Sequence, residues 1–161
     1  MKSDATRDTD VLVIGAGPTG LTLAGELALA GATVTVIERQ EIPSGQSRGG
    51  GISPRTCEVL AMRGLIDDAA AVSVKRGAGG GHFAGLPVPL DARPWRTRHP
   101  DGLMIPQDRL EQVLESRVRE LGAVVHRGTE LTGLSLGDDE VSATVTGPDG
   151  PAVLRSRYLV A

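Results

Sequence analysis

Aromatic side chains are scarce in this chain, and positive charge is not in excess. Only Phe83, Trp95 and Tyr158 are aromatic among 161 residues, and 17 basic residues face 20 acidic ones, for a net charge of −3. Binding of nucleic acid relies on basic surfaces that neutralise phosphates and often on rings that stack on bases. The composition therefore argues against a nucleic-acid partner and against attraction to an anionic membrane surface.

Cysteine is almost absent as well. Cys57 is the only one, so the chain cannot form an internal disulfide, and an oxidising compartment is not indicated. The three histidines, His82, His99 and His126, are not spaced as ligands of a metal ion, either with each other or with Cys57. We expect no metal site, and we expect Cys57 to be packed inside the protein rather than reactive.

Long uninterrupted apolar runs are also lacking. The most apolar stretch, residues 11–37, is broken by Gly15, Pro18 and Glu26, and acidic residues precede it. This pattern fits neither a signal peptide nor a membrane-spanning helix. The sequence thus favours a cytoplasmic protein without a membrane partner.

Glycine, by contrast, is abundant. It makes up 22 of the 161 residues, about twice the usual share of ~7%. The length predicts one domain, large enough to bury a core of its own. The glycines are therefore expected to serve particular turns and close approaches.

Residues 11–38 predict a strand, a helix and a second strand. The β-branched run 11–14 ends at Gly15, and apolar residues recur at helical spacing between Thr19 and Ala30. Gly31 stands where this helix should end, and 33–38 is again apolar and β-branched. Such a unit predicts two parallel strands joined by a helix, the core of an α/β fold.

Two further helices are predicted. Ser53 followed by Pro54 indicates a helix start, with the helix running to about Arg63. A second helix is predicted from Asp108 to Leu121, with Asp108 and Glu111 as a capping pair. Its buried face is expected to consist of Leu110, Val113, Leu114, Arg117 and Leu121. Residues 64–105 between the two helices indicate only short strands or a hairpin.

The last 40 or so residues predict mostly β-structure. A strand at 123–127 is followed by an antiparallel meander with strands at 130–136, 140–147 and 152–157, joined by turns at 137–139 and 148–150. Residues 158–161 predict the start of one more buried strand. Because a core strand normally continues into a loop, the sequence is interpreted as a fragment or as a protein completed by another chain.

The first turn has the pattern of a dinucleotide-binding site. Residues 15–20, GAGPTG, follow a predicted strand and open a predicted helix, and Glu38 closes the next strand. In this pattern Gly15 permits a tight turn, Gly17 lets a pyrophosphate approach the backbone, and Gly20 lets the helix pack closely. Unpaired amides at the helix start favour phosphates, and a carboxylate at Glu38 favours a free ribose diol over a 2′-phosphate. The residues therefore favour FAD or NAD over NADP.

Several motifs together carry a resemblance to one enzyme family. They are GAGPTG, the Glu38-Arg39 pair, Arg48 within GQSRGGGISPRTCEVL (45–60), GHFAGLPVPL (81–90) and PQDRLEQVL (106–114). With these, the chain resembles the single-component flavin-dependent aromatic hydroxylases of the para-hydroxybenzoate-hydroxylase type, most of all the branch that acts on aromatic polyketides. The resemblance spans nearly all of residues 10–161.

The resemblance implies a fold and a set of cofactor contacts. The fold is a Rossmann-like FAD-binding domain of the glutathione-reductase type, with a parallel βαβ core and an antiparallel meander. The whole chain, 1–161, would be the incomplete N-terminal part of that domain, with short strands in 64–105 bordering a substrate domain. The implied FAD-binding residues are Gly15, Ala16, Gly17, Pro18, Thr19, Gly20, Glu38, Arg39, Arg48, Gln107 and Leu131.

Some of these residues also have plain structural interpretations. Arg39 can also be a solvated charge and Gln107 a helix-start residue, while Leu131 fits the core as well as it fits a cofactor contact. Arg48, among glycines, is implied to reach the flavin side of the cofactor, and Gln107 its ribityl or phosphate region. Leu131 is implied to lie near the adenine. No residue is identified as a catalytic acid or base.

The activity implied is hydroxylation of an aromatic polyketide or other phenolic substrate with FAD, NAD(P)H and dioxygen. The DG and GD motifs that the family carries after the strand matching residues 158–161 lie beyond the part that is matched, so the resemblance covers the family's N-terminal portion only. Two alternatives stay open. One is a non-catalytic or split-enzyme flavin-binding fragment that works with a separately encoded C-terminal portion, and the other is an NAD-dependent dehydrogenase.

Overall fold

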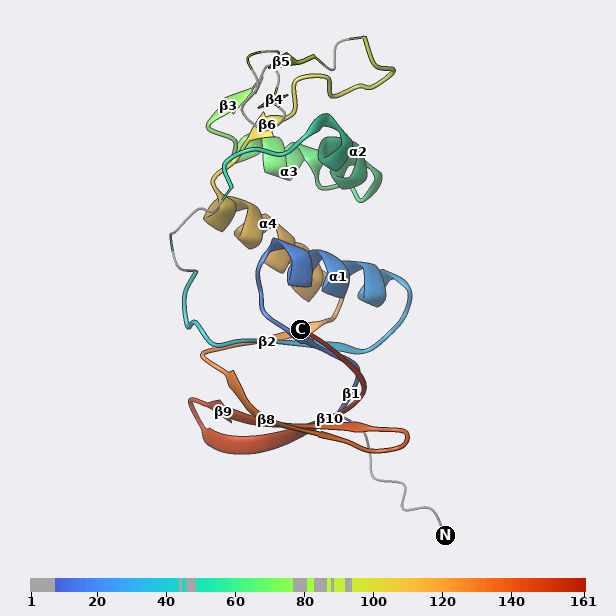
Figure 1. Cartoon of the computed structure of the whole chain (residues 1–161), viewed down its shortest axis with the longest axis vertical. Coiled ribbons are helices and arrows are strands. Elements are labelled where there is room, and N and C mark those ends of the chain that lie inside the picture. The colour runs from blue at the N-terminus through green and yellow to red at the C-terminus, as the bar shows by residue number, and fades with distance from the viewer. Residues whose placement is uncertain are drawn as a thin grey trace. The chain divides into compact units, whose positions relative to one another are not determined.

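The computed structural model describes residues 8–43, 45, 49–76, 81–82, 87, 89–91 and 94–161 (Figure 1). The chain divides into two compact units. The sheet unit comprises Met1–Ser44 and Leu114–Ala161, and the helical unit comprises Gly45–Val113. The helix α4 runs from one unit into the other.

The sheet unit contains most of the regular structure. In chain order its elements are β1 (Thr9–Ile14), α1 (Pro18–Leu29), β2 (Val34–Glu38), the second half of α4 (Gln107–Glu120), β7 (Val124–Arg127), β8 (Glu130–Leu136), β9 (Val141–Gly147) and β10 (Gly150–Val160). The strand–helix–strand unit, the strand after α4 and the three-stranded meander are therefore confirmed.

The strands of this unit form one mixed sheet in the order β7-β2-β1-β10-β9-β8. β7, β2, β1 and the end of β10 are parallel, and β8, β9 and the start of β10 are antiparallel. The predicted separate strand at 158–161 is wrong. β10 is continuous for 11 residues, because it pairs first with β9 and then, from Ser156 on, with β1. The prediction that this segment is buried is also wrong, since Tyr158 is 55% exposed.

Two layers cover the parallel strands. Figure 1 shows α1 and the second half of α4 on one side of β1 and β2 and the meander on the other. Both faces of these strands are covered because successive side chains of a strand point to opposite faces, so each face presents apolar side chains. Leu12 and Ile37 pack with Ala143 and Val145 of β9 in the main apolar cluster, while Val13 faces α1. The fold class, a parallel βαβ core with an antiparallel meander, is confirmed.

Ser156 marks the residue at which β10 changes partners. Its side chain is fully buried, and its Oγ has no hydrogen-bond partner within the described part of the chain. A buried hydroxyl without a partner destabilises the folded state. We expect Ser156→Ala to raise the free energy of unfolding by about 1 kcal/mol in urea titrations. A loss of stability would show instead that the hydroxyl makes a bond that this arrangement does not contain.

The predicted ends of α1 and of α4 are both correct to within one residue. α1 ends before Gly31, which has a φ of +87° and therefore favours glycine. α4 begins at Gln107, because the carbonyl of Pro106 already accepts the amides of Arg109 and Leu110. Asp108 consequently lies in the first turn and does not cap the helix. The predicted capping pair is wrong.

The buried face of α4 also differs from the prediction. Leu110, Leu114 and Val118 are its most buried residues, spaced four apart, with Val118 only 1% exposed. Arg117 pairs with Glu120 at the surface, at 3.3 Å. Arg117 has the sequence spacing of a residue on the buried face, but its charged group stays at the surface. Val118 packs against α1 instead, close to Gly25.

The helical unit consists of short elements. They are α2 (Pro54–Met62), α3 (Ile66–Ala71), four two-residue strands, β3 (Lys75–Arg76), β4 (Gly81–His82), β5 (Pro89–Leu90) and β6 (Leu103–Met104), and the first half of α4. Ser53 Oγ accepts the amide of Thr56 at 3.3 Å, as expected of a helix cap. The short strands expected in 64–105 are thus present, as β3 pairs with β6 and β4 with β5.

Cys57 is fully buried in α2, as expected. Burial raises the pKa of its thiol above the usual value and outweighs a backbone hydrogen bond that lowers it. The thiol therefore stays protonated and unreactive at neutral pH. Among the helices in the described ranges, none is both long and apolar enough to cross a bilayer.

Candidate functional site

The turn between β1 and α1 has the backbone geometry that its sequence predicts. Gly15 has a φ of +104°, a conformation that residues with a side chain rarely adopt. Its amide donates to the carbonyl of Ile37 at 2.7 Å, which ties the turn to the end of β2. The turn thus lies at the carboxyl ends of two neighbouring parallel strands, where open α/β sheets bind ligands.

Gly17 and Gly20 occupy opposite environments. A Cβ at Gly20 would overlap the carbonyl oxygen of Gly15 and approach Val13 Cγ1 to 3.4 Å. A Cβ at Gly17 would meet nothing within 4 Å, and Gly17 has an ordinary extended conformation. The fold therefore needs a glycine at position 20, whereas at position 17 the glycine only leaves space open.

The start of α1 offers hydrogen-bond donors. Gly17 is the N-cap and provides no side-chain cap, and Pro18 occupies the first helical position. The amides of Thr19 and Gly20 belong to the first turn, and first-turn amides have no carbonyl partner within a helix. Together with the helix dipole they favour an anion at this position.

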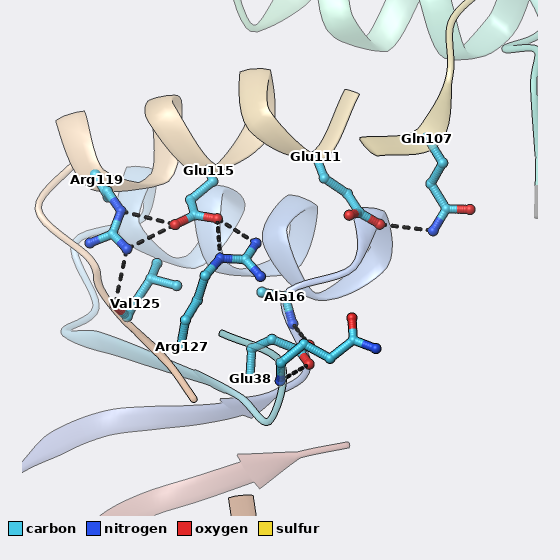
Figure 2. A network of polar contacts seen from close by, with 9 residues as sticks. Ala16, Glu38, Gln107, Glu111, Glu115, Arg119, Val125 and Arg127 are labelled. Carbon is cyan, nitrogen blue, oxygen red and sulfur yellow. Dashed lines mark hydrogen bonds and ion pairs between the residues drawn. The ribbon is translucent and has the colours of Figure 1, made fainter. Parts of the chain in front are cut away.

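Glu38 is held in place by backbone amides on both sides (Figure 2). Its Oε2 accepts the amide of Ala16 at 2.9 Å, and its Oε1 accepts the amide of Gln40 at 2.9 Å. Each oxygen retains a lone pair for a further donor. A sugar hydroxyl that approaches this carboxylate therefore meets an acceptor whose orientation is already fixed.

A cavity of about 330 Å³ lies beside this carboxylate. Its lining consists of Ile14, Gly15, Ile37, Glu38, Arg39, Thr129, Glu130 and Leu131. All of these belong to the sheet unit. The cavity combines apolar walls with two carboxylates, those of Glu38 and Glu130, and one guanidinium, a composition suited to a sugar and a flat apolar ring.

The structure brings most of the predicted site residues together. Gly15 to Gly20 form the turn and the start of α1, and Glu38 is hydrogen-bonded to the turn at Ala16. Arg39 and Leu131 both line the cavity. Arg39 is exposed as a solvated charge would be, and Leu131 also packs against the main apolar cluster. Each of the two residues therefore has the structural role that was the plainer interpretation and also lines the cavity. Their contacts with a cofactor stay predictions.

Two predicted residues are not part of this group. Arg48 lies outside the described residues. Gln107 belongs to the helical unit, where its Nε2 donates to Glu111 Oε1 at 2.8 Å (Figure 2). A role for either in binding a cofactor stays a prediction.

Sequence reasoning missed Thr129 and Glu130, which line the cavity next to Leu131. They follow β7, and the amide of Thr129 donates to the carbonyl of Glu38 at 2.9 Å. A usable signal was present in the chain, because β7 is a third parallel strand and its carboxyl end must meet the same edge of the sheet.

A charged network lies on α4 and β7 next to the site (Figure 2). Glu115 Oε2 accepts from Nε and Nη2 of Arg127 at 2.9 and 2.6 Å. Its Oε1 accepts from Nε and Nη2 of Arg119 at 3.1 and 2.8 Å, and Arg119 Nη2 also donates to the carbonyl of Val125. This network joins the second half of α4 to the end of β7.

Glu115 makes stability depend on pH. Burial alone would raise the pKa of Glu115, but hydrogen bonds from Arg127 and Arg119 outweigh it and hold the pKa below its ordinary value. A lowered folded-state pKa contributes stability that is present above the unfolded value of about 4.3 and is lost as pH falls through the folded value. Urea titrations between pH 7 and pH 3 should show a smaller acid loss for Glu115→Gln than for the wild type. Equal losses would contradict the assignment.

The residues present fit the adenosine diphosphate half of a dinucleotide. The helix start favours the diphosphate, the fixed carboxylate of Glu38 suits a ribose diol, and the cavity between Arg39 and Leu131 has room for a base. The open space at Gly17 allows a phosphate to approach the backbone. No other part of the cofactor is placed by these residues.

Comparison with known proteins agrees with this geometry. Residues 8–161 match the family described as FAD binding domain. The chain is 48% identical over 151 residues to a Streptomyces rimosus protein named 12-dehydrotetracycline 5-monooxygenase/anhydrotetracycline 6-monooxygenase, covering 94% of this chain and 30% of that protein.

Two solved structures show the same fold. An anhydrotetracycline hydroxylase from Streptomyces rimosus superposes with a TM-score of 0.87 at 46% identity, over 94% of this chain and 30% of the other. A ternary complex of aklavinone-11 hydroxylase with FAD and aklavinone superposes with a TM-score of 0.75 at 30% identity, over 95% and 32%. The chain thus spans about 30% of the length of these relatives. By sequence and by fold, it belongs to the FAD-binding-domain family.

Proposed function

We propose that this chain is the FAD-binding portion of a flavin-dependent monooxygenase that hydroxylates an aromatic polyketide or other phenolic substrate with NAD(P)H and dioxygen. The observation that carries the proposal is the cavity between Glu38 and Leu131, at the end of a glycine turn whose geometry suits a dinucleotide. The family match and the names of the similar hydroxylases support it.

In this proposal the chain's own residues bind and orient the cofactor. The amides at the start of α1 hold the pyrophosphate, Glu38 accepts the ribose hydroxyls, and Arg39 and Leu131 border the adenine. When bound, FAD supplies the hydride acceptance from NAD(P)H and the oxygen activation that hydroxylation needs. Arg48 and Gln107 are proposed to contact the flavin half, and the short strands of 64–105 to border the substrate domain.

We propose further that turnover needs a C-terminal portion, either continuous with this chain or separately encoded. Besides the length of the relatives, the end of β10 supports this. Tyr158 and Val160 are 55% and 41% exposed, although they lie beside Val11 and Val13, which are buried. A sheet surface of this kind is normally covered. The reaction is proposed to take place in the cytoplasm, where NAD(P)H is available and Cys57 stays reduced.

Ligand titration tests the proposal. Calorimetry of the purified chain should show FAD and ADP competing for one site, with NAD binding more weakly than FAD. Tighter binding of NAD, with no displacement by FAD, would favour an NAD-dependent dehydrogenase. Adding the C-terminal portion of a similar hydroxylase should restore oxidation of NAD(P)H that depends on a phenolic substrate. A chain that binds FAD but never supports turnover would be a non-catalytic fragment.

A further inference from the structure

The outer wall of the cavity is attached to the end of β2 by backbone contacts. This wall consists of Thr129, Glu130 and Leu131. The amide of Thr129 donates to the carbonyl of Glu38 at 2.9 Å, and the amide of Gly128 donates to that of Gln40 at 3.3 Å. The position of the wall relative to the Glu38 carboxylate therefore depends on where β7 ends.

Arg127 is the last residue of β7 and lies two residues before Thr129, the first residue of this wall. It is the register partner of Glu38 in the parallel pairing of β2 with β7. Its guanidinium does not line the cavity but points to α4, where it makes the two bonds to Glu115 Oε2 (Figure 2). Both side chains are only 16% exposed.

Because two donors of the Arg127 guanidinium converge on one oxygen of Glu115, the direction of the guanidinium is fixed as well as its distance. Glu115 is itself held from the other side by Arg119, which is anchored to the carbonyl of Val125 in β7. Such a pair is costly to desolvate and is poor evidence for stability by itself. Its position, with Arg127 two residues before the cavity wall, suggests a different use.

The geometry points to Glu115 and Arg127 as a positioning pair for the adenosine half of the site. They touch no ligand; they hold the end of β7 so that Thr129 to Leu131 stand at the right distance from Glu38. This inference rests on the proposed function, because it takes the cavity to bind adenosine. Breaking the pair therefore weakens binding of ADP even though every cavity-lining residue is unchanged.

Three variants separate positioning from a general loss of stability. Glu115→Gln removes the charge that Arg127 needs. The double variant Glu115→Gln with Arg127→Met removes both charges, which restores stability because no unpaired charge stays buried. Val118→Ala is the matched control, since it truncates a buried residue of the same helix that packs close to Gly25 of α1 and leaves both members of the pair unchanged. Each is compared with the wild type for ADP affinity by calorimetry and for unfolding in urea.

We expect Glu115→Gln and the double variant to bind ADP about fivefold more weakly or worse. Val118→Ala should lose stability but bind ADP within twofold of the wild type. Hydrogen exchange of the Gly128 and Thr129 amides should become faster in both pair variants, while β2 amides keep their protection. If ADP affinity follows stability across all variants, or if the pair variants bind normally, the pair has no positioning role. Failure of the wild type to bind ADP would overturn the proposed function instead.

Discussion

Gly17→Ala is expected to weaken FAD binding at least tenfold while changing the free energy of unfolding by less than about 1 kcal/mol. The free space around Gly17 is the reason. A methyl group there meets no protein atom within 4 Å, and the backbone is already in a conformation open to alanine. The methyl would instead occupy the space through which a pyrophosphate approaches the amides at the start of α1.

Gly20→Ala, only three residues further along the turn, should behave in the opposite way. Its methyl would overlap the carbonyl oxygen of Gly15, and backbone at such a tight turn has little room to move. Overpacking of this kind typically costs 1–3 kcal/mol, so we expect a loss of about 2 kcal/mol in stability. Urea titration and FAD titration of both variants check the contrast. If Gly17→Ala bound FAD normally, the pyrophosphate would not lie against this turn.

Glu38→Ala is expected to weaken binding of ADP by roughly 10- to 100-fold. Hydrogen bonds to a charged group are worth about 1.5–3 kcal/mol, and the substitution removes the acceptor for the ribose hydroxyls. It also releases the amides of Ala16 and Gln40, which the carboxylate holds at 2.9 Å each, so the turn loses an anchor as well. Both losses act on the same half of the cofactor.

Glu38→Gln is the matched control because it keeps the size of the side chain. Its amide oxygen can accept only one of the two backbone amides, so its ADP affinity should lie between the wild type and Glu38→Ala. Discrimination gives a second measurement. The wild type should bind AMP better than the 2′-phosphorylated form, and Glu38→Ala should lose most of that preference, since a negative charge no longer repels the phosphate. Unchanged affinity and preference in both variants would remove Glu38 from the site.

Much of this fold could be predicted because its signals are local. The glycine turn, Gly31 and the alternation of the meander each act within a few residues, and the backbone follows them. The predictions were wrong where contacts between residues distant in the sequence determine the structure. Residues 158–161 appeared to start a strand of their own, but β1 pairs with the end of β10 and makes one strand of it.

The site divides in the same way. Gly15, Gly17, Gly20 and Glu38 follow from one sequence pattern, because the turn and the strand end lie close together in the chain. Thr129 and Glu130 reach the cavity only because β7 pairs with β2, a contact between residues about 90 positions apart in sequence. The Glu115–Arg127 pair depends likewise on how α4 lies against β7. No local sequence pattern predicts either arrangement.

The most direct test of the account is to map where ADP binds the folded chain. The central claim is that the adenosine half of FAD lies at the carboxyl ends of β1 and β2, between Glu38 and Leu131. Titrating ADP into labelled protein and following backbone amide resonances by NMR should shift Gly15, Ala16, Glu38 and residues 129–131, and leave those around Cys57 unchanged. Shifts confined to other parts of the chain, or no saturable shifts at these residues, would contradict the claim.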